Sequence, residues 1–185
     1  MTAPSGPGEI SPITVITPVP RYWSWWLRLT WPGSDRSAFI KGPILRLSFI
    51  HAAHWGLFDR IPSAGSDRLP SPYVLFQSNF DGEAFEYAEA FALEMPWRIR
   101  GLWGRAYGFP GPKPPNPFVD YVLGHAVKGP YHYYARYPTG TVRTVRSALA
   151  LRESFKRFEE KAANLDAQGF AKAWREFLTR EQRNL

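Results

Sequence analysis

The spacing of apolar residues changes along this chain, and this change constrains the fold more than any other feature. Apolar residues alternate with other residues in 44–51 and in 73–80, a pattern typical of β-strands. In 83–95 and in 141–178 they recur every three or four positions, as in amphipathic helices. A further stretch, 131–137, alternates aromatic residues and predicts a third strand. This order predicts an α+β fold, with a small antiparallel sheet and helices on one face.

Differences in composition divide the chain into three regions. Residues 1–20 are rich in proline and predict an extended arm, in which the β-branched run 13–17 suits a short edge strand. Residues 21–43 are rich in tryptophan, and 44–185 is expected to form a single α+β domain that ends in helices. The chain has 18 prolines and no cysteine, so stiff loops are expected and disulfides are excluded.

The charge and hydropathy patterns exclude several classes of protein. The formal net charge is +7, but the basic residues are spread along the chain and form no run typical of a nucleic-acid-binding arm. No apolar stretch approaches the roughly 18 residues that a membrane span needs. The N-terminus carries Glu9 and several prolines in place of a basic start and an apolar core. We therefore expect no secretory signal. The expected location is the cytoplasm.

The tryptophan-rich segment 21–31 predicts an amphipathic helix. Its polar residues Arg21, Ser24 and Arg28 recur at helical spacing and form one narrow stripe. The wide face carries the tryptophans, which are Trp23, Trp25, Trp26 and Trp31. Three interpretations stay open: the helix packs on the domain or on a partner subunit, it lies in a membrane interface, or it covers a ligand as a lid.

The strongest candidate for chemistry is a histidine near the end of one predicted strand, set beside an amide and a carboxylate at the end of the next. Antiparallel pairing would bring His51 close to Asn79 and Asp81. Imidazole can act as acid or base, the amide can hold a developing oxyanion, and the carboxylate can orient the histidine. The alternative is structural: His51 as a hydrogen-bonded core residue, and Asp81 with Gly82 as a turn that caps the helix 83–95.

Aromatic residues further along the chain complete the predicted site. Trp55, Trp103 and Tyr134 are expected to line a cavity by stacking, and His132 lies on a strand pattern from which it could reach the same cavity. An apolar slot of this kind also suits haem, with His132 or His51 as the axial ligand. No spacing typical of zinc ligands occurs, so no metal site is expected.

Several segments carry a resemblance to a known group of proteins. They are 47–55, 73–82 with its Ser-Asn-Phe-Asp-Gly motif, 102–104, 108–111 and 132–134. They look like an uncharacterised family of actinobacterial type, across roughly residues 40–160. Its organisation is similar to that of ferredoxin-like, dimeric α+β barrel proteins. That group includes cofactor-free monooxygenases, small cyclases, chlorite dismutases and dye-decolorising peroxidases, and fold analogy does not select among them.

These observations predict a small enzyme that binds a flat hydrophobic molecule and performs oxidative or cyclising chemistry. His51 would be its acid–base residue and Asn79 its polar anchor. One alternative is a haem-binding, peroxidase-like protein, because 79–82 resembles the GxxDG segment of those peroxidases, although Ser78 stands where their first glycine belongs. The other is a non-catalytic interaction or peripheral membrane protein. A sheet this small commonly dimerises or encloses a ligand on its uncovered face, so a homodimer is expected.

Overall fold

The computed structural model shows two compact units, Met1–Thr139 and Gly140–Leu185, which are considered one at a time below. The structure describes residues 9–34, 47–61, 67–128 and 133–184. The boundary between the units differs from the predicted division. The arm and the tryptophan-rich segment belong to the same unit as the sheet, whereas the C-terminal helices form a unit of their own.

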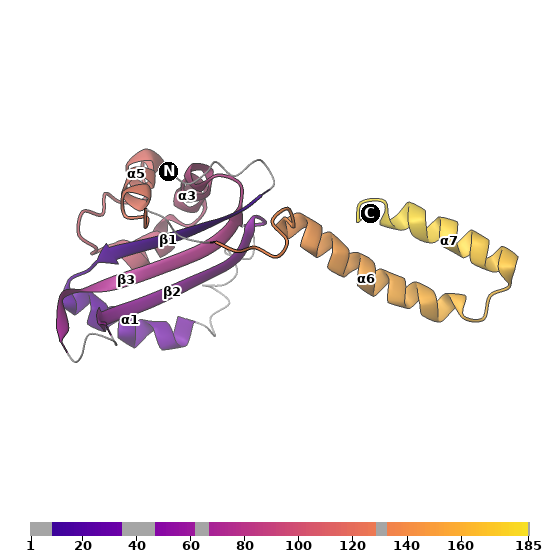
Figure 1. Ribbon diagram of the computed structural model, residues 1–185, viewed down its shortest axis with the longest axis horizontal. Coiled ribbons are helices and arrows are strands. Elements are labelled where there is room, and N and C mark those ends of the chain that lie inside the picture. The colour runs from indigo at the N-terminus through magenta and orange to yellow at the C-terminus, as the bar shows by residue number, and fades with distance from the viewer. Residues whose placement is uncertain (1–8, 35–46, 62–66, 129–132, 185) are drawn as a thin grey trace. The chain divides into compact units, whose positions relative to one another are not determined.

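The first unit is built on a three-stranded antiparallel sheet (Figure 1). Its strands are β1 (Ile10–Pro18), β2 (Ile50–Arg60) and β3 (Arg68–Asp81), in the order β1-β3-β2. The predicted antiparallel pairing of the second and third strands is confirmed. The strand predicted over 13–17 is also confirmed. The strand is longer than the predicted range 13–17, since it runs from Ile10 to Pro18 and every one of its residues pairs with β3.

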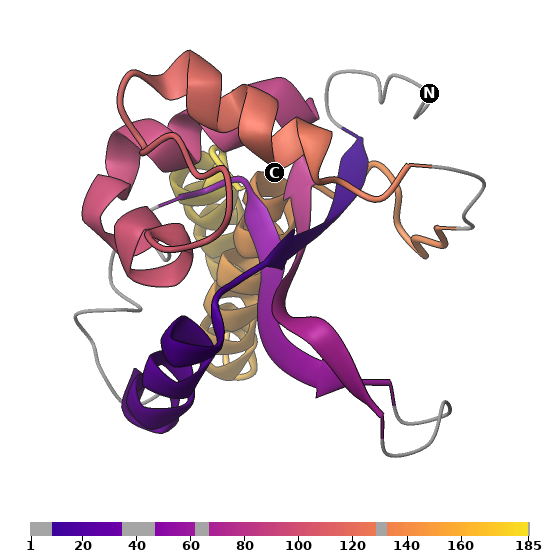
Figure 2. The same cartoon turned by 90° about the vertical axis from the view of Figure 1, so that its left-hand side faces the viewer.

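Helices cover one face of this sheet (Figure 2). They are α1 (Arg21–Ser34), α3 (Ala84–Glu94), α4 (Pro96–Trp103) and α5 (Pro115–Gly124). Alternation along β3 sends Val74, Phe76 and Phe80 under these helices, where all three are buried. Burial of this apolar face is the main source of stability of the unit. The predicted α+β fold, with helices on one face of a small sheet, is therefore confirmed.

A rudimentary fourth strand lies at the outer edge of β1. Ala126 forms an isolated antiparallel bridge with Val15. The amide of Ile16 donates to the carbonyl of His125 at 3.2 Å, and the amide of Val127 donates to the carbonyl of Thr14 at 2.8 Å. With this bridge the order becomes 4-1-3-2, and the succession of strands and helices is that of the ferredoxin-like βαββαβ motif.

The prediction of a strand over 131–137 is wrong for the part that the structure describes. Residues 133–137 form no strand, and Tyr134 is 85% exposed. The free edge of β1, where a further strand would pair, is taken near its middle by the bridge to Ala126. Aromatic alternation favours a strand only where a neighbouring strand is available for pairing.

The second unit is a helical hairpin of α6 (Val142–Ala162) and α7 (Ala167–Glu181), as the period of the sequence predicted. Side chains cap both helices, because Thr141 accepts a hydrogen bond from the amide of Thr144, and Asp166 accepts one from the amide of Gly169. A cluster of rings fills the space between the helices. Its members are Phe155, Phe158, Phe170, Trp174 and Phe177.

A buried carboxylate ties the end of α7 to the interior of α6 and makes the stability of the hairpin depend on pH. Ser154 and Asn184 donate hydrogen bonds to the Glu181 carboxylate, and these bonds, that of Ser154 foremost, lower the pKa of Glu181 from its ordinary value of 4.5. A carboxyl whose folded pKa is lowered stabilises the fold above its ordinary pKa, and this contribution is lost as the pH falls through the folded pKa. We therefore expect the hairpin to melt at lower temperature in acid, as followed by circular dichroism.

Glu181→Gln tests this assignment, because the amide keeps a hydrogen-bond acceptor but does not titrate. The variant is expected to lose most of the difference in melting temperature between neutral and acidic solution. Glu159→Gln, which changes an exposed carboxylate of α6, is the matched control and should keep the difference. An unchanged acid response in Glu181→Gln would contradict the assignment.

Candidate functional site

A bulge in β2 sets the position of His51. Ile50 pairs with Phe80 and Ala52 pairs with Asn79, so β2 advances two residues where β3 advances one. His51 is the extra residue. Bulges of this kind redirect a side chain out of the regular alternation, and they are frequent next to active sites.

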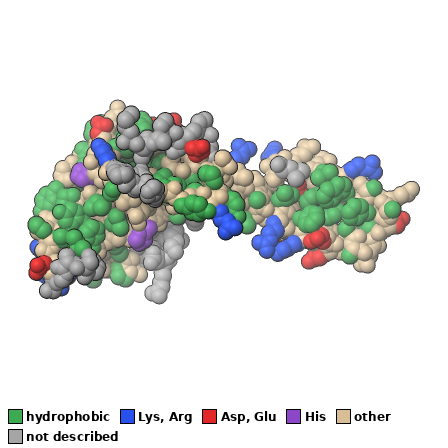
Figure 3. Space-filling model, in the orientation of Figure 1, with side chains coloured by type: hydrophobic (Ala, Val, Ile, Leu, Met, Phe, Trp, Pro, Cys, Tyr) green, Lys and Arg blue, Asp and Glu red, His purple; other side chains and the backbone are tan. Residues whose placement is uncertain are grey.

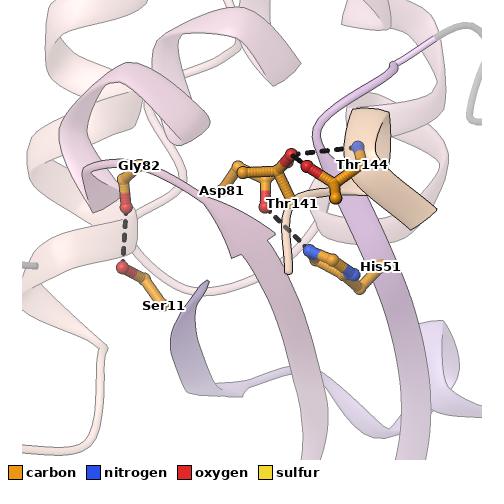
Figure 4. A network of polar contacts seen from close by, with 6 residues as sticks. All are labelled: Ser11, His51, Asp81, Gly82, Thr141 and Thr144. Atoms are coloured by element: carbon orange, nitrogen blue, oxygen red, sulfur yellow. Dashed lines mark hydrogen bonds and ion pairs between the residues drawn. The ribbon is translucent and has the colours of Figure 1, made fainter. Parts of the chain in front are cut away.

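The imidazole that the bulge redirects meets a carboxylate from the end of β3. Nε2 of His51 lies 2.7 Å from Oδ1 of Asp81 (Figure 4). The side chains are 20% and 17% exposed, so the pair is partly shielded from water. The predicted approach of His51 to the 78–82 segment is thereby confirmed. A carboxylate on one ring nitrogen fixes the orientation of the imidazole and leaves Nδ1 for exchange of a proton.

The predicted capping role of Asp81 is wrong. The N-cap of α3 is Glu83, which makes no side-chain capping bond, and the carboxylate of Asp81 is directed at His51 instead. The turn between them needs Gly82, whose φ of 90° lies in a region that other residues rarely adopt. Ser11 fixes this turn from β1, because its hydroxyl donates to the carbonyl of Gly82 at 2.7 Å (Figure 4).

A groove of about 490 Å³ lies on the sheet face opposite the helices, here called the open face. Strands β1, β2 and β3 line its floor, and Val127 and Tyr133 line its rim. Pro12 and Ala52 supply apolar surface in the floor. Side chains with hydrogen-bonding groups also line it, namely Thr14, His54, Gln77, Asn79 and Tyr133. A nearly flat floor with a few polar groups suits a planar ligand that carries one or two polar substituents.

The groove and the histidine–carboxylate pair share one strand and one face. Asn79 and Asp81 are two residues apart on β3, so their side chains leave the same side of the sheet. The rise of an antiparallel strand separates them by about 7 Å. His51 and Asp81 do not themselves line the groove, but their neighbours Ala52 and Asn79 do. This juxtaposition is the main reason to regard the face as a functional site.

A tyrosine at the rim adds a hydroxyl to the groove. Burial raises the pKa of Tyr133, so its hydroxyl stays protonated at neutral pH and can donate a hydrogen bond. In the floor, Nε2 of Gln77 lies 3.5 Å from Oγ1 of Thr14, which links β1 and β3 across the open face. No lysine, arginine, aspartate or glutamate is among the residues that line the groove.

The structure does not bring the other predicted site residues to this groove. The rings of Trp55 and Trp103 both contact Phe76 under the helices, at centroid distances of 5.6 and 5.5 Å. They belong to the core on the opposite face of the sheet. Tyr134 is exposed and is not among the residues that line the groove, and His132 lies outside the described residues.

Several groove residues were missed from the sequence. Gln77 could have been found, because it shares the alternation of Asn79 along β3. Ala52 is placed beside them only by the register of β2, which the bulge sets. Thr14 and Tyr133 could not have been found from the sequence. No pattern in the residues around them shows that β1 and the segment after Val127 meet β3 at this point.

Haem ligation through Nε2 of His51, the usual ligand atom, would compete with the contact of this nitrogen to Asp81. The other proposed ligand, His132, lies outside the described residues. Within the described ranges, no group of three or more histidine, aspartate or glutamate side chains could hold a metal ion.

Comparisons of the chain with protein families, with curated proteins and with solved structures found no match. The resemblance to an actinobacterial-type family therefore stays a prediction. A second hollow of similar volume lies beside α4 and is lined by Trp23, Arg100 and Arg105 among others. Neither His51 nor Asp81 borders it.

Proposed function

We propose that this protein binds a flat, largely apolar small molecule on the open face and transfers a proton with His51. The observation that carries the proposal is the placement of a bulged histidine, oriented by a carboxylate at 2.7 Å, beside a groove on the same face. Proton transfer of this kind is the step that oxidative and cyclising reactions on aromatic or ketone substrates share.

The step is written for a ligand with a carbonyl group. Asn79 donates an amide hydrogen bond to the carbonyl oxygen and stabilises negative charge that develops there. Nδ1 of His51 accepts a proton from the carbon next to the carbonyl, and the electron pair of that C–H bond forms the enolate. Asp81 accepts the hydrogen bond of the Nε2–H group and stabilises the imidazolium. Return of the proton to carbon or to oxygen completes the step, and no oxidant is needed.

The probe for this proposal is 2-tetralone, a fused-ring ketone with exchangeable protons next to its carbonyl. Saturation-transfer NMR measures its binding, and deuterium uptake in heavy water measures proton transfer. With the wild-type protein we expect both binding and exchange above the buffer rate. His51→Gln should retain binding but lower the protein-dependent exchange by about 100-fold, a typical contribution of a general base.

Two variants at exposed positions of β2 separate the groove from a general surface effect. Ala52→Trp fills the groove from its floor and should abolish both binding and exchange. Arg60→Trp adds the same ring near the end of the strand, outside the groove, and should change neither. Exchange that survives in His51→Gln would remove the catalytic role, and binding that survives in Ala52→Trp would remove the groove as the site.

A further inference from the structure

Helix α1 has its largest apolar side chains on the outside. Trp25 and Leu29 are each 67% exposed, and Tyr22 and Trp26 are exposed as well. These four residues, spaced at i, i+3, i+4 and i+7, form one stripe, here called the aromatic stripe. The buried side of the same helix carries Ser24 and Leu27. An ordinary surface helix has the opposite arrangement, with large apolar side chains inside and small polar ones outside.

The contacts that hold α1 in place keep the aromatic stripe outward. On the inner side Leu27 is fully buried, and Nε1 of Trp23 donates to the carbonyl of Leu102 at 3.1 Å. Arg21 donates to the carbonyl of Leu69 at 2.9 Å and ties the first turn to the end of β3. The stripe is therefore presented on a fixed helix. Stacking of Trp26 on Trp23, with ring centroids 4.5 Å apart, also fixes one of its rings.

Positive charge surrounds the stripe. Helix α1 contains two arginines and no acidic residue. Arg21 and Arg28 each precede a stripe residue by one position and so flank it, and Arg28 also reaches Asp59 of β2 at 3.3 Å. At the adjoining end of the β2–β3 hairpin, Arg60 and Arg68 face each other as cross-strand partners. Figure 3 shows hydrophobic surface over this end of the unit.

The exposed apolar residues of α3 and α4 provide a contrast within the same unit. Leu93 and Trp97 are also exposed. Near them α3 carries Glu86, Glu89 and Glu94, and the guanidinium of Arg98 lies 4.0 Å from the ring of Trp97. Carboxylates are repelled by an anionic surface, whereas arginines are attracted to it. The patch on α3 and α4 thus has mixed charge, whereas α1 carries arginines and no acidic residue.

We infer that α1 seats this protein on the surface of an anionic membrane through the aromatic stripe. Tryptophan and tyrosine favour the boundary between headgroups and acyl chains, where the ring is apolar and its N–H or O–H group stays hydrated. Leu29 adds apolar area below the headgroups, and the four arginines meet acidic lipids. In the part of the chain that the structure describes, no helix is both long enough and apolar enough to cross a bilayer. The helix therefore lies in the plane of the interface.

The test is sedimentation of the full chain with phosphatidylcholine vesicles that contain phosphatidylserine, and with vesicles of phosphatidylcholine alone. We expect partitioning into the mixed vesicles that weakens with added salt. The double variant Trp25→Ser with Leu29→Ser should lower the partition coefficient by about tenfold or more, since both side chains would be buried on binding. Both positions are two-thirds exposed, so the fold should be retained.

The matched control is Leu93→Ser with Trp97→Ser, which removes the same two residue types from the mixed-charge patch on α3 and α4. Its partitioning should equal that of the wild type. Equal losses in the two double variants, or no sedimentation of the wild type with either vesicle, would overturn the inference. A self-association that the Trp25→Ser, Leu29→Ser variant abolishes, in the absence of vesicle binding, would assign the stripe to a protein contact and overturn it as well.

Discussion

Replacing Phe76 by alanine is expected to lower the free energy of unfolding of the Met1–Thr139 unit by about 3–5 kcal/mol. The ring is 2% exposed and lies where the central strand meets the helices. It contacts Trp55 of β2, Phe91 of α3 and Trp103 of α4. Truncation removes all three contacts and leaves a cavity that these large, fixed rings cannot close.

Urea denaturation followed by tryptophan fluorescence measures this loss. Because small domains are stable by only about 5–15 kcal/mol, a loss of this size moves the transition midpoint far toward low urea. The neighbouring Gln77 is exposed on the open face, so Gln77→Ala should change the free energy of unfolding by about 0.5 kcal/mol or less. Equal effects at the two positions would contradict the assignment of the two faces of β3.

Replacing Phe158 by alanine is expected to melt the helical hairpin at room temperature. Phe158 is 7% exposed and its ring contacts four others: Phe155, Phe170, Trp174 and Phe177. A two-helix unit has a small core, and isolated helices of this length are marginal in water. Truncation of the central ring should lower the free energy of unfolding by about 3–5 kcal/mol, which is more than the total stability expected of such a hairpin.

The measurement is far-UV circular dichroism of the full chain. The helical signal should fall by the share of α6 and α7, which are 21 and 15 residues long, while the urea transition of the Met1–Thr139 unit stays in place. Lys156→Ala is the control, because its contact with Glu153 is an exposed ion pair of 3.5 Å, which contributes little. A single transition that shifts as a whole would show that the two units unfold together.

The period of apolar residues predicted most of the fold because burial requires it. Strand β3 has one face under the helices and one outside, so its alternation is strict. Its last residue was predicted to within one position, but the strand begins at Arg68, five residues before the predicted start. The helix over 83–95 and the two helices within 141–178 were found for the same reason. The aromatic run 131–137 led to a wrong strand prediction. Aromatic residues favour a strand only where a neighbouring strand is available for pairing, and this depends on the whole sheet.

The candidate site was predicted in part. The pairing of β2 with β3 brought His51 to Asp81 as expected. In an antiparallel pair the first residues of one strand lie opposite the last residues of the next, whatever the length of the loop between them. Trp55 was expected to line the same cavity by stacking, and regular alternation would give residues 51 and 55 the same face. The bulge breaks that parity, and Trp55 packs in the core. Bulges leave no periodic signal, so the sequence alone could not separate the two residues.

Removal of the single residue His51 would place Ile50 next to Ala52, and their partners Phe80 and Asn79 are already adjacent on β3. The pairing of β2 with β3 would then be regular from Ile50 to Phe58, and the imidazole would be gone. The deletion of one residue that makes this hairpin more regular is thus also the deletion that removes the imidazole, its most reactive group. A shortened chain of this kind would be expected to gain order in the hairpin and lose proton transfer, which would separate architecture from chemistry in one experiment.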